Sequence, residues 1–137
     1  MILRTVEPSP ADLERLAVEV PANTPVTMLN LLRFHQQAQY PKGSGHAPCT
    51  GREAFERYSE VARQKMKQVG GQPMFWADAA ARFIGPVGEE WDVMVLVNYP
   101  SVQAFLKMLA MPDYLAATVH RSAALEDTRL TVLRTPE

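Results

Sequence analysis

The sequence lacks several features that would point to a particular class of protein. It has one cysteine, Cys49, so no internal disulfide can form, and we expect a reducing compartment, the cytoplasm. Neither sign of charge predominates, because 14 Lys and Arg stand against 15 Asp and Glu. This balance predicts no binding to nucleic acid or to a membrane surface. No apolar run is long enough to span a bilayer, and Met1–Pro10 lacks a signal-peptide core.

Motifs for cofactors and metals are missing as well. Gly43–Gly45 lacks the third glycine and the strand-to-helix turn of a dinucleotide-binding fingerprint. His35, His46 and Cys49 are possible soft ligands, but their spacing matches no standard zinc site and a fourth ligand is missing. We therefore expect no metal and no cofactor.

What the sequence does have is enough apolar material for a core. Hydrophobic residues make up 47% of 137 residues, which suits one domain of ordinary size. We expect a single domain over residues 1–137, with its core at about residues 26–135. There are no internal repeats and no low-complexity segments.

The first third of the chain predicts a helix, a strand and a long loop. Ser9 can cap a helix that begins at Pro10 and ends before Pro21. Val26–Phe34 is a predicted strand, apolar on both faces. The segment His35–Thr50 is rich in Pro and Gly and is long for a loop in a compact domain, so we expect it to be functional, mobile or ordered against a partner.

The rest of the chain completes an α+β pattern. Thr50 and Glu53 have the spacing of a capping box at the start of an amphipathic helix, and Gly70 can end that helix. The further predicted elements are strand Pro73–Ile84, hairpin loop Gly85–Gly88, strand Trp91–Tyr99, a helix from Ser101 through Ala110, a helix from Pro112 to Ala124 and strand Thr128–Arg134. The order is one extra helix followed by βαββαβ, which predicts a ferredoxin-like antiparallel sheet with its helices on one face.

The two central strands of that sheet predict a dimer. Val26–Phe34 and Trp91–Tyr99 do not alternate between apolar and polar residues, as strands with one wet face should. Something must therefore cover the second face of the sheet. The N-terminal helix could cover part of it, and a second copy of the chain could cover most of it.

Several strings in the sequence are typical of one protein family. They are LNLLRF (Leu29–Phe34), GREAFERY (Gly51–Tyr58), Gly70-Gly71, Trp91-Asp92, Tyr99-Pro100-Ser101 with Ala104-Phe105-Leu106, Pro112-Asp113-Tyr114 and HRSAAL (His120–Leu125). From about Val26 to Leu130 the chain resembles the bacterial family of domain of unknown function 1330, in the dimeric α/β-barrel superfamily. The resemblance implies the fold and a homodimer. Similar folds serve cofactor-free oxygenases, lactone isomerases, haem enzymes and stress proteins, so it implies no single reaction.

His120 and Arg121 are the candidate catalytic residues. Histidine titrates near neutral pH and could move a proton, and arginine can hold a carboxylate with two parallel hydrogen bonds. The alternative is structural: both lie near the end of a helix, where cations stabilise the dipole and bond to the last carbonyls. The structural reading has the stronger support.

Asn30 and Tyr114 are the candidate ligand-binding residues. Asn30 is an amide within an apolar strand and needs hydrogen-bond partners, from a ligand, a loop or a second chain. Tyr114 follows Met111-Pro112, where proline breaks the helix and leaves a gap over the sheet. We expect any ligand site on the helix side of the sheet, although the sequence does not say which face Asn30 occupies.

Three functions remain open. One is a cofactor-free enzyme acting on a small apolar or aromatic acid. Another is a non-catalytic homodimer that binds a small molecule or serves in stress. The third is a haem enzyme with His120 or His35 as the axial ligand.

Overall fold

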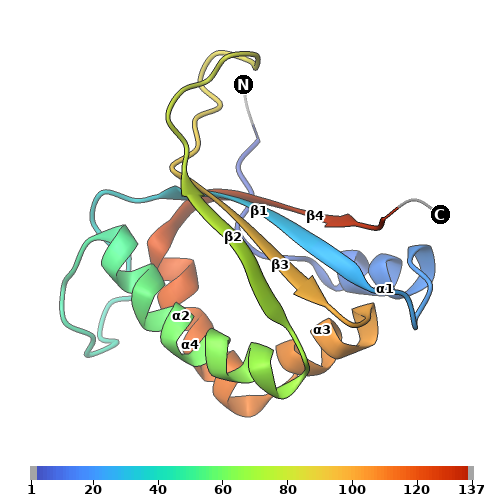
Figure 1. Ribbon diagram of the computed structural model, residues 1–137. Coiled ribbons are helices and arrows are strands. Elements are labelled where there is room, and N and C mark those ends of the chain that lie inside the picture. The colour runs from blue at the N-terminus through green and yellow to red at the C-terminus, as the bar shows by residue number, and fades with distance from the viewer. Residues whose placement is uncertain (1–2, 136–137) are drawn as a thin grey trace.

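The protein is built on a four-stranded antiparallel sheet, and a computed structural model describes residues 3–135 (Figure 1). The strand order is β2-β3-β1-β4, which is the ferredoxin-like order with β1 and β3 in the centre. The elements are α1 (Pro10–Glu19), β1 (Val26–Phe34), α2 (Gly51–Gln68), β2 (Gln72–Asp78), β3 (Val93–Tyr99), α3 (Val102–Leu109), α4 (Pro112–Ala124) and β4 (Leu125–Leu133). The predicted fold class is therefore confirmed.

The helices begin where the sequence predicts. Ser9 and Thr50 each accept a hydrogen bond from the third helical residue, and the carboxylate of that residue bonds back, so both capping boxes are present. Ser101 caps α3 by accepting a hydrogen bond from the amide of Ala104, without the reciprocal bond. Gly70 ends α2 with a positive φ of 83°, a conformation that glycine adopts without strain.

Several predicted strand boundaries are wrong, and the third strand, expected from Trp91, begins only at Val93. The strand expected to reach Ile84 ends at Asp78, because β3 begins only at Val93 and offers no partner beyond that point. Residues 79–92 therefore form one long connection, not a short hairpin loop. The last strand starts at Leu125, not at Thr128, since the chain passes from α4 into β4 without a turn.

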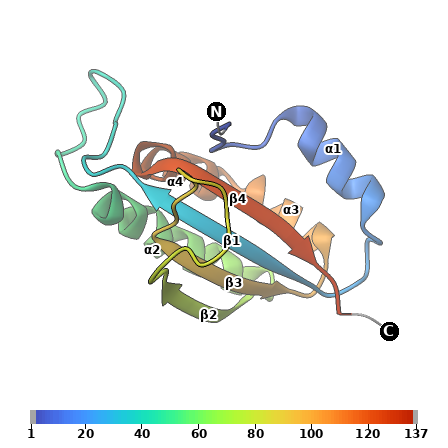
Figure 2. The same cartoon turned by 90° about the horizontal axis from the view of Figure 1, so that it is seen from above.

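The helix face of the sheet carries the core. On β1, Val26, Met28 and Leu32 point toward the helices, and they are buried among α2, α3 and α4. Helix α1 joins this side too, where Leu16 and Val20 pack at the edge of the core, so it does not cover the opposite face. Figure 2 shows α1 beside β4 and α3.

The opposite face of the sheet, called here the open face, is apolar and has no helix over it. Its apolar residues alternate with the core residues along each strand and pair across the sheet. They are Leu29, Leu31, Phe75, Met94 and Leu96. Each is at least partly exposed. No helix of residues 3–135 is long and apolar enough to span a bilayer.

The loop at residues 35–50 is held at both ends. At its start, His35 donates its amide to the carbonyl of Ala124 and the amide of Gln39 donates to the carbonyl of Ala123, both at 2.8 Å. At its end, the carbonyl of Cys49 accepts from the amide of Ala38 at 2.9 Å. Residues 41–48 between the two ends are all exposed. The part of the loop free to move is therefore shorter than the sequence suggests.

We expect trypsin to cut first after Lys42. This residue lies in the exposed part of the loop, whereas most other basic residues lie in helices or strands. Timed digestion followed by mass spectrometry of the fragments will identify the site. Resistance at Lys42 with early cutting in another segment would contradict the expectation.

Candidate functional site

Asn30 lies on the helix face of the sheet, which settles its orientation. It pairs with Val95 in the sheet, and its side-chain amide lies 3.4 Å from the carbonyl oxygens of Met28 and Val95. It stands between the two halves of the core. At 3.4 Å both hydrogen bonds are long, so the amide is only weakly held by the protein itself.

Tyr114 is buried and bonded to a second tyrosine. Its hydroxyl lies 2.7 Å from that of Tyr58, and the two rings meet edge to face. Burial raises the pKa of Tyr58 well above its ordinary value, and burial likewise raises the pKa of Tyr114. Both hydroxyls therefore stay protonated near neutral pH, and they are already hydrogen-bonded to each other.

His120 belongs to a cluster that fastens the loop at residues 35–50. Its Nδ1 forms a 2.7 Å hydrogen bond with the Tyr40 hydroxyl, which also accepts from Arg57 at 3.1 Å. The centre of the His46 ring lies 4.7 Å from the centre of the His120 ring. Burial, with the nearby charges of His46 and Arg57, lowers the pKa of His120. The imidazole is therefore neutral near pH 7 and can accept a proton.

Arg121 reaches the N-terminal segment of the chain. Its guanidinium donates to the carbonyl of Val6 at 2.7 Å. The expected bond to the last carbonyls of its own helix is replaced by this longer-range contact. His120 and Arg121 are neighbours in sequence, but their hydrogen bonds lead to different segments, Tyr40 and Val6.

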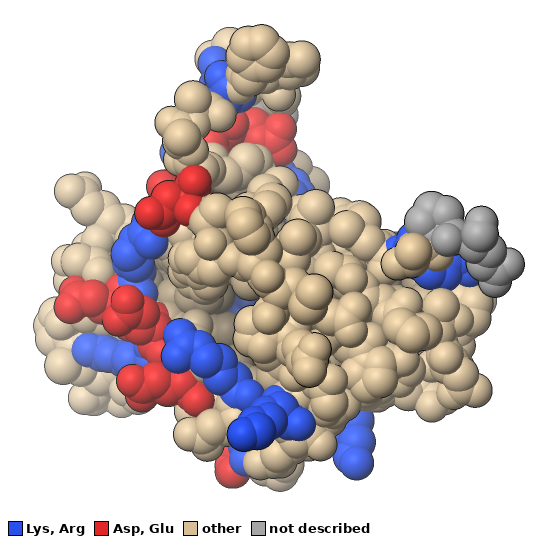
Figure 3. Space-filling view, viewed as in Figure 1, with Lys and Arg blue, Asp and Glu red and all other residues tan. Residues whose placement is uncertain are grey.

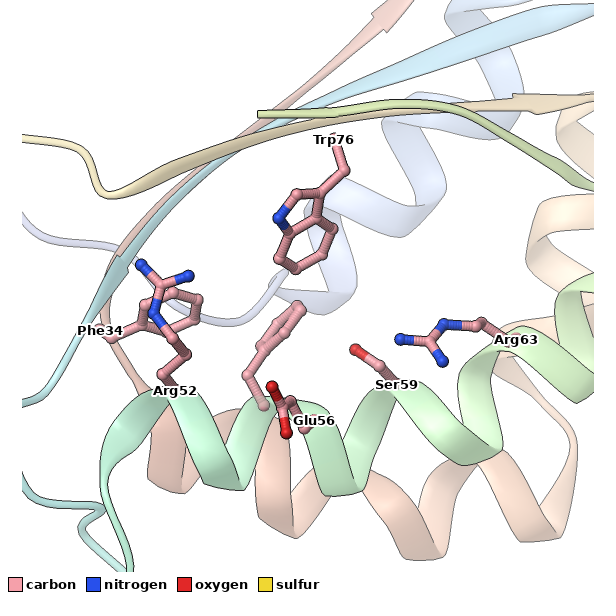
Figure 4. Close-up of a pocket in the computed structure, with 7 residues that line it drawn as sticks. Phe34, Arg52, Glu56, Ser59, Arg63 and Trp76 are labelled. Carbon is pink, nitrogen blue, oxygen red and sulfur yellow. The ribbon is translucent and has the colours of Figure 1, made fainter. Parts of the chain in front are cut away.

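A cavity of about 230 Å³ opens between α2 and the ends of β1 and β2 (Figure 4). Trp76 points from β2 toward α2, and the Phe34 and Phe55 rings continue the wall. The Phe55 ring centre lies 5.5 Å from that of Phe34 and 6.2 Å from that of Trp76. One side of the cavity is therefore a continuous aromatic surface.

The other side of the cavity is polar and comes from α2. Arg52, Glu56, Ser59 and Arg63 line it, at a spacing that puts all four on one face of the helix. Ser59 is buried, so its hydroxyl lies deep in the site. Figure 3 shows charged side chains gathered along α2, next to the uncharged surface of β2.

The two arginines of the cavity, Arg52 and Arg63, differ in the contacts that they already make within the protein. Arg52 lies 5.1 Å from the Phe34 ring centre and 3.4 Å from a carboxylate oxygen of Asp78. Arg63 has no carboxylate of residues 3–135 within ion-pair distance. Arg63 is therefore the cation that is free to meet an anionic ligand.

The four residues singled out from the sequence do not line this cavity. The cavity is on the helix side of the sheet, at the β2 edge rather than at the break between α3 and α4. Sequence reasoning missed Arg52, Glu56, Ser59 and Arg63 because they look like the solvated face of a helix. Ser59, in the middle of the helix and four residues after Phe55, was the sequence signal that could have pointed to this cavity.

Metal ligands are not gathered anywhere in the described part of the chain. Residues 3–135 contain no group of three or more His, Cys, Asp and Glu side chains placed to hold a metal ion. Cys49 is buried and its thiol is free.

The sequence of the chain matches a family model from residue 45 to residue 135, over most of its length. The model is that of domain of unknown function 1330. The chain belongs to this family. The chain is also similar to RPA0582 of Rhodopseudomonas palustris, a protein of unknown function with two crystal structures. One is 31% identical with a TM-score of 0.89, covering 98% of this chain and 99% of that one. The other, of the methylated protein, is 32% identical with a TM-score of 0.90, covering 99% and 98%.

More distant solved structures share the fold alone. A dimeric ferredoxin-like protein of Bacteroides fragilis, of unknown function, is 9% identical with a TM-score of 0.52 and covers 84% of this chain and 100% of its own. SnoaB of Streptomyces nogalater, a cofactor-independent oxygenase, is 14% identical with a TM-score of 0.52 and covers 83% and 95%. No curated protein sequence matches the chain.

Proposed function

We propose that this DUF1330 protein is a homodimer that binds a small aromatic carboxylic acid in the cavity between α2 and β2. The observation that carries the proposal is the lining of that cavity, with aromatic rings on one side and arginines on the other. A cytoplasmic location remains our prediction, supported by the free thiol of Cys49.

The open face of the sheet supports the homodimer. Leu29, Leu31 and Leu96 lie at its centre, and no element of residues 3–135 covers them. A contiguous apolar surface of this kind usually marks an interface. Stacking two open faces would bury both surfaces and give an aligned sandwich of sheets.

The chemistry of the cavity supports an aromatic acid. A volume of about 230 Å³ suits a single substituted ring rather than a dinucleotide or a haem. Trp76 and Phe55 can pack against the faces or edges of a ring. Arg63 can hold a carboxylate with charge-assisted hydrogen bonds, and the Ser59 hydroxyl can bond to a ring substituent.

Replacing Arg63 with Met should weaken binding of such an acid by about tenfold or more, because a hydrogen bond to a charged group is worth about 1.5–3 kcal/mol. Suitable probes are benzoate, 4-hydroxybenzoate and cinnamate, and titration calorimetry will measure the affinity of each. Benzamide, which lacks the negative charge, should bind wild type and R63M equally weakly.

Arg15→Met is the matched control, since Arg15 is an exposed arginine on α1 that pairs with Asp12 and Glu19, away from the cavity. It should leave the affinity unchanged. A probe that binds the wild type and keeps full affinity for both Arg63→Met and Trp76→Phe would place the ligand site elsewhere. Loss of affinity in His120→Ala alone would favour the site near His120.

A second candidate function is a cofactor-free enzyme in which His120 moves a proton. The hydrogen bond to Tyr40 orients the imidazole, and its lowered pKa keeps the ring neutral. In this proposal Arg121 holds an anionic group, while Asn30 and Tyr114 contact the substrate. Conversion of a bound acid by the wild type, lost in His120→Ala with binding retained, would favour this function over simple binding.

A further inference from the structure

The long connection between β2 and β3, residues 79–92, forms a projecting arm. It rises from the sheet on the side away from the helices, as Figures 1 and 2 both show. Its base is fixed by the amide of Ala79, which donates to the carbonyl of Asp92 at 2.8 Å. Farther along, Arg33 of β1 donates to the carbonyl of Gly88 at 3.2 Å, next to the tip of the arm. The arm is therefore aimed outward from the open face.

The tip of the arm is apolar and almost wholly exposed. Phe83, Ile84 and Val87 are 96%, 90% and 87% exposed. The two legs of the arm are joined by an ion pair between Arg82 and Glu90 at 2.8 Å, and a hollow of about 460 Å³ lies beside them. Phe83 and Ile84 line this hollow, and with Val87 they form an exposed apolar surface of the kind that marks an interaction site.

The length of the arm indicates where that partner lies. Two stacked sheets are about 10 Å apart. Fully extended, a leg of about six residues at about 3.3 Å per residue would reach at most about 20 Å, and the hydrogen bond from Arg33 to Gly88 keeps the second leg closer to the sheet than that. An arm that rises from the open face is therefore long enough to reach the edge of a second copy's sheet stacked on that face.

We propose that the arm clasps a second copy of this chain, with its apolar tip packed against the edge of the partner's sheet. The proposal rests on the homodimer proposed above. A second copy is favoured because the arm projects on the same side as the open face, and the apolar surface continues from the arm through Phe75 and Ala77 to Leu96. By two-fold symmetry each protomer both gives and receives one arm.

The test is a variant with a polar tip, Phe83→Ser with Ile84→Ser and Val87→Ser. Sedimentation velocity over a dilution series will give the dimer Kd, which we expect to rise by about a hundredfold because three large apolar side chains lose their buried surface. Circular dichroism should show an unchanged fold, since the three side chains are almost wholly exposed in the protomer.

The matched control is Val18→Ser with Leu115→Ser, two exposed apolar residues on the helix side, which should leave the Kd unchanged. A monomeric wild type at all concentrations would refute the homodimer itself. A wild-type dimer whose Kd is unchanged by the serine tip would refute only the clasp. In that case, binding to phosphatidylcholine vesicles can be compared between the wild type and the serine variant. Binding by the wild type alone would show that the tip has a membrane as its partner.

A tryptophan at the tip gives a second, independent measurement. In a Phe83→Trp variant, the added emission should be blue-shifted and shielded from acrylamide in the dimer. With Leu31→Asp also present, it should be red-shifted and fully quenched. Equal quenching in both proteins would contradict a buried tip.

Discussion

Replacing Leu31 with Asp should give a folded monomer, whereas replacing Val95 with Asp should unfold the protein. Both residues lie in the two central strands and both are apolar. Leu31 is on the open face, opposite Met94, and belongs to neither half of the core. Val95 is on the helix face and packs against both halves of the core.

The difference follows from where each new carboxylate would lie. In a separated L31D protomer the carboxylate at position 31 would be in water, so the charge costs little until the open face is covered by a second copy. A carboxylate at position 95 would lie among the apolar side chains of both halves of the core. The cost of at least about 3 kcal/mol is a large part of the about 5–15 kcal/mol that usually stabilises a domain.

Light scattering at micromolar concentration, with thermal unfolding followed by circular dichroism, will separate the two outcomes. Leu115→Asp on the outer surface of α4 is the control and should change neither mass nor stability. A Leu31→Asp protein with twice the chain mass would show that the open face is not the interface.

The contrast between Leu31 and Val95 also shows what the sequence can predict. The pattern of Val26–Phe34 predicts a strand that is buried on both faces, and local signals place its ends correctly. The caps at Ser9, Thr50 and Ser101 are likewise local, because each depends on residues three apart. Which of two apolar residues faces the helices depends on register across the sheet, which no local pattern contains.

The cavity was beyond prediction for the same reason. Arg52 and Arg63 resemble ordinary surface charges until α2 is placed opposite Trp76, and that placement is a long-range contact. The sequence singles out His120 as a titratable residue near the end of a helix. Its partner Tyr40, however, lies 80 positions away in the sequence. The hydrogen-bond partners of His120 and Arg121, Tyr40 and Val6, lie in segments for which the sequence predicts no helix or strand.

Replacing Gly51 with Ala should destabilise the protein strongly, although alanine is the better helix former by about 1 kcal/mol. Gly51 is the first residue of α2 and is buried. An added Cβ would lie 2.1 Å from the carbonyl oxygen of His35 and 2.8 Å from that of Ala124. Both contacts are to backbone, and the hydrogen bond from the His35 amide to the Ala124 carbonyl holds the two segments together at 2.8 Å.

Relief of the clash therefore requires α2 to move away from the end of β1 and the end of α4. Overpacking against immobile groups costs about 1–3 kcal/mol and sometimes more, so we expect a net loss of at least about 2 kcal/mol and a fall in Tm of several degrees. Because Arg52 and Phe55 follow on the same helix, the shift should also weaken ligand binding in the cavity.

Gly85→Ala is the matched control, since its Cβ would meet only the flexible side chain of Arg82. That variant should unfold within about one degree of the wild type. Thermal unfolding of both variants gives the comparison. If Gly51→Ala were as stable as the wild type, the helix preference of alanine would have outweighed the clash, and the junction of β1, α2 and α4 would be looser than its hydrogen bonds indicate.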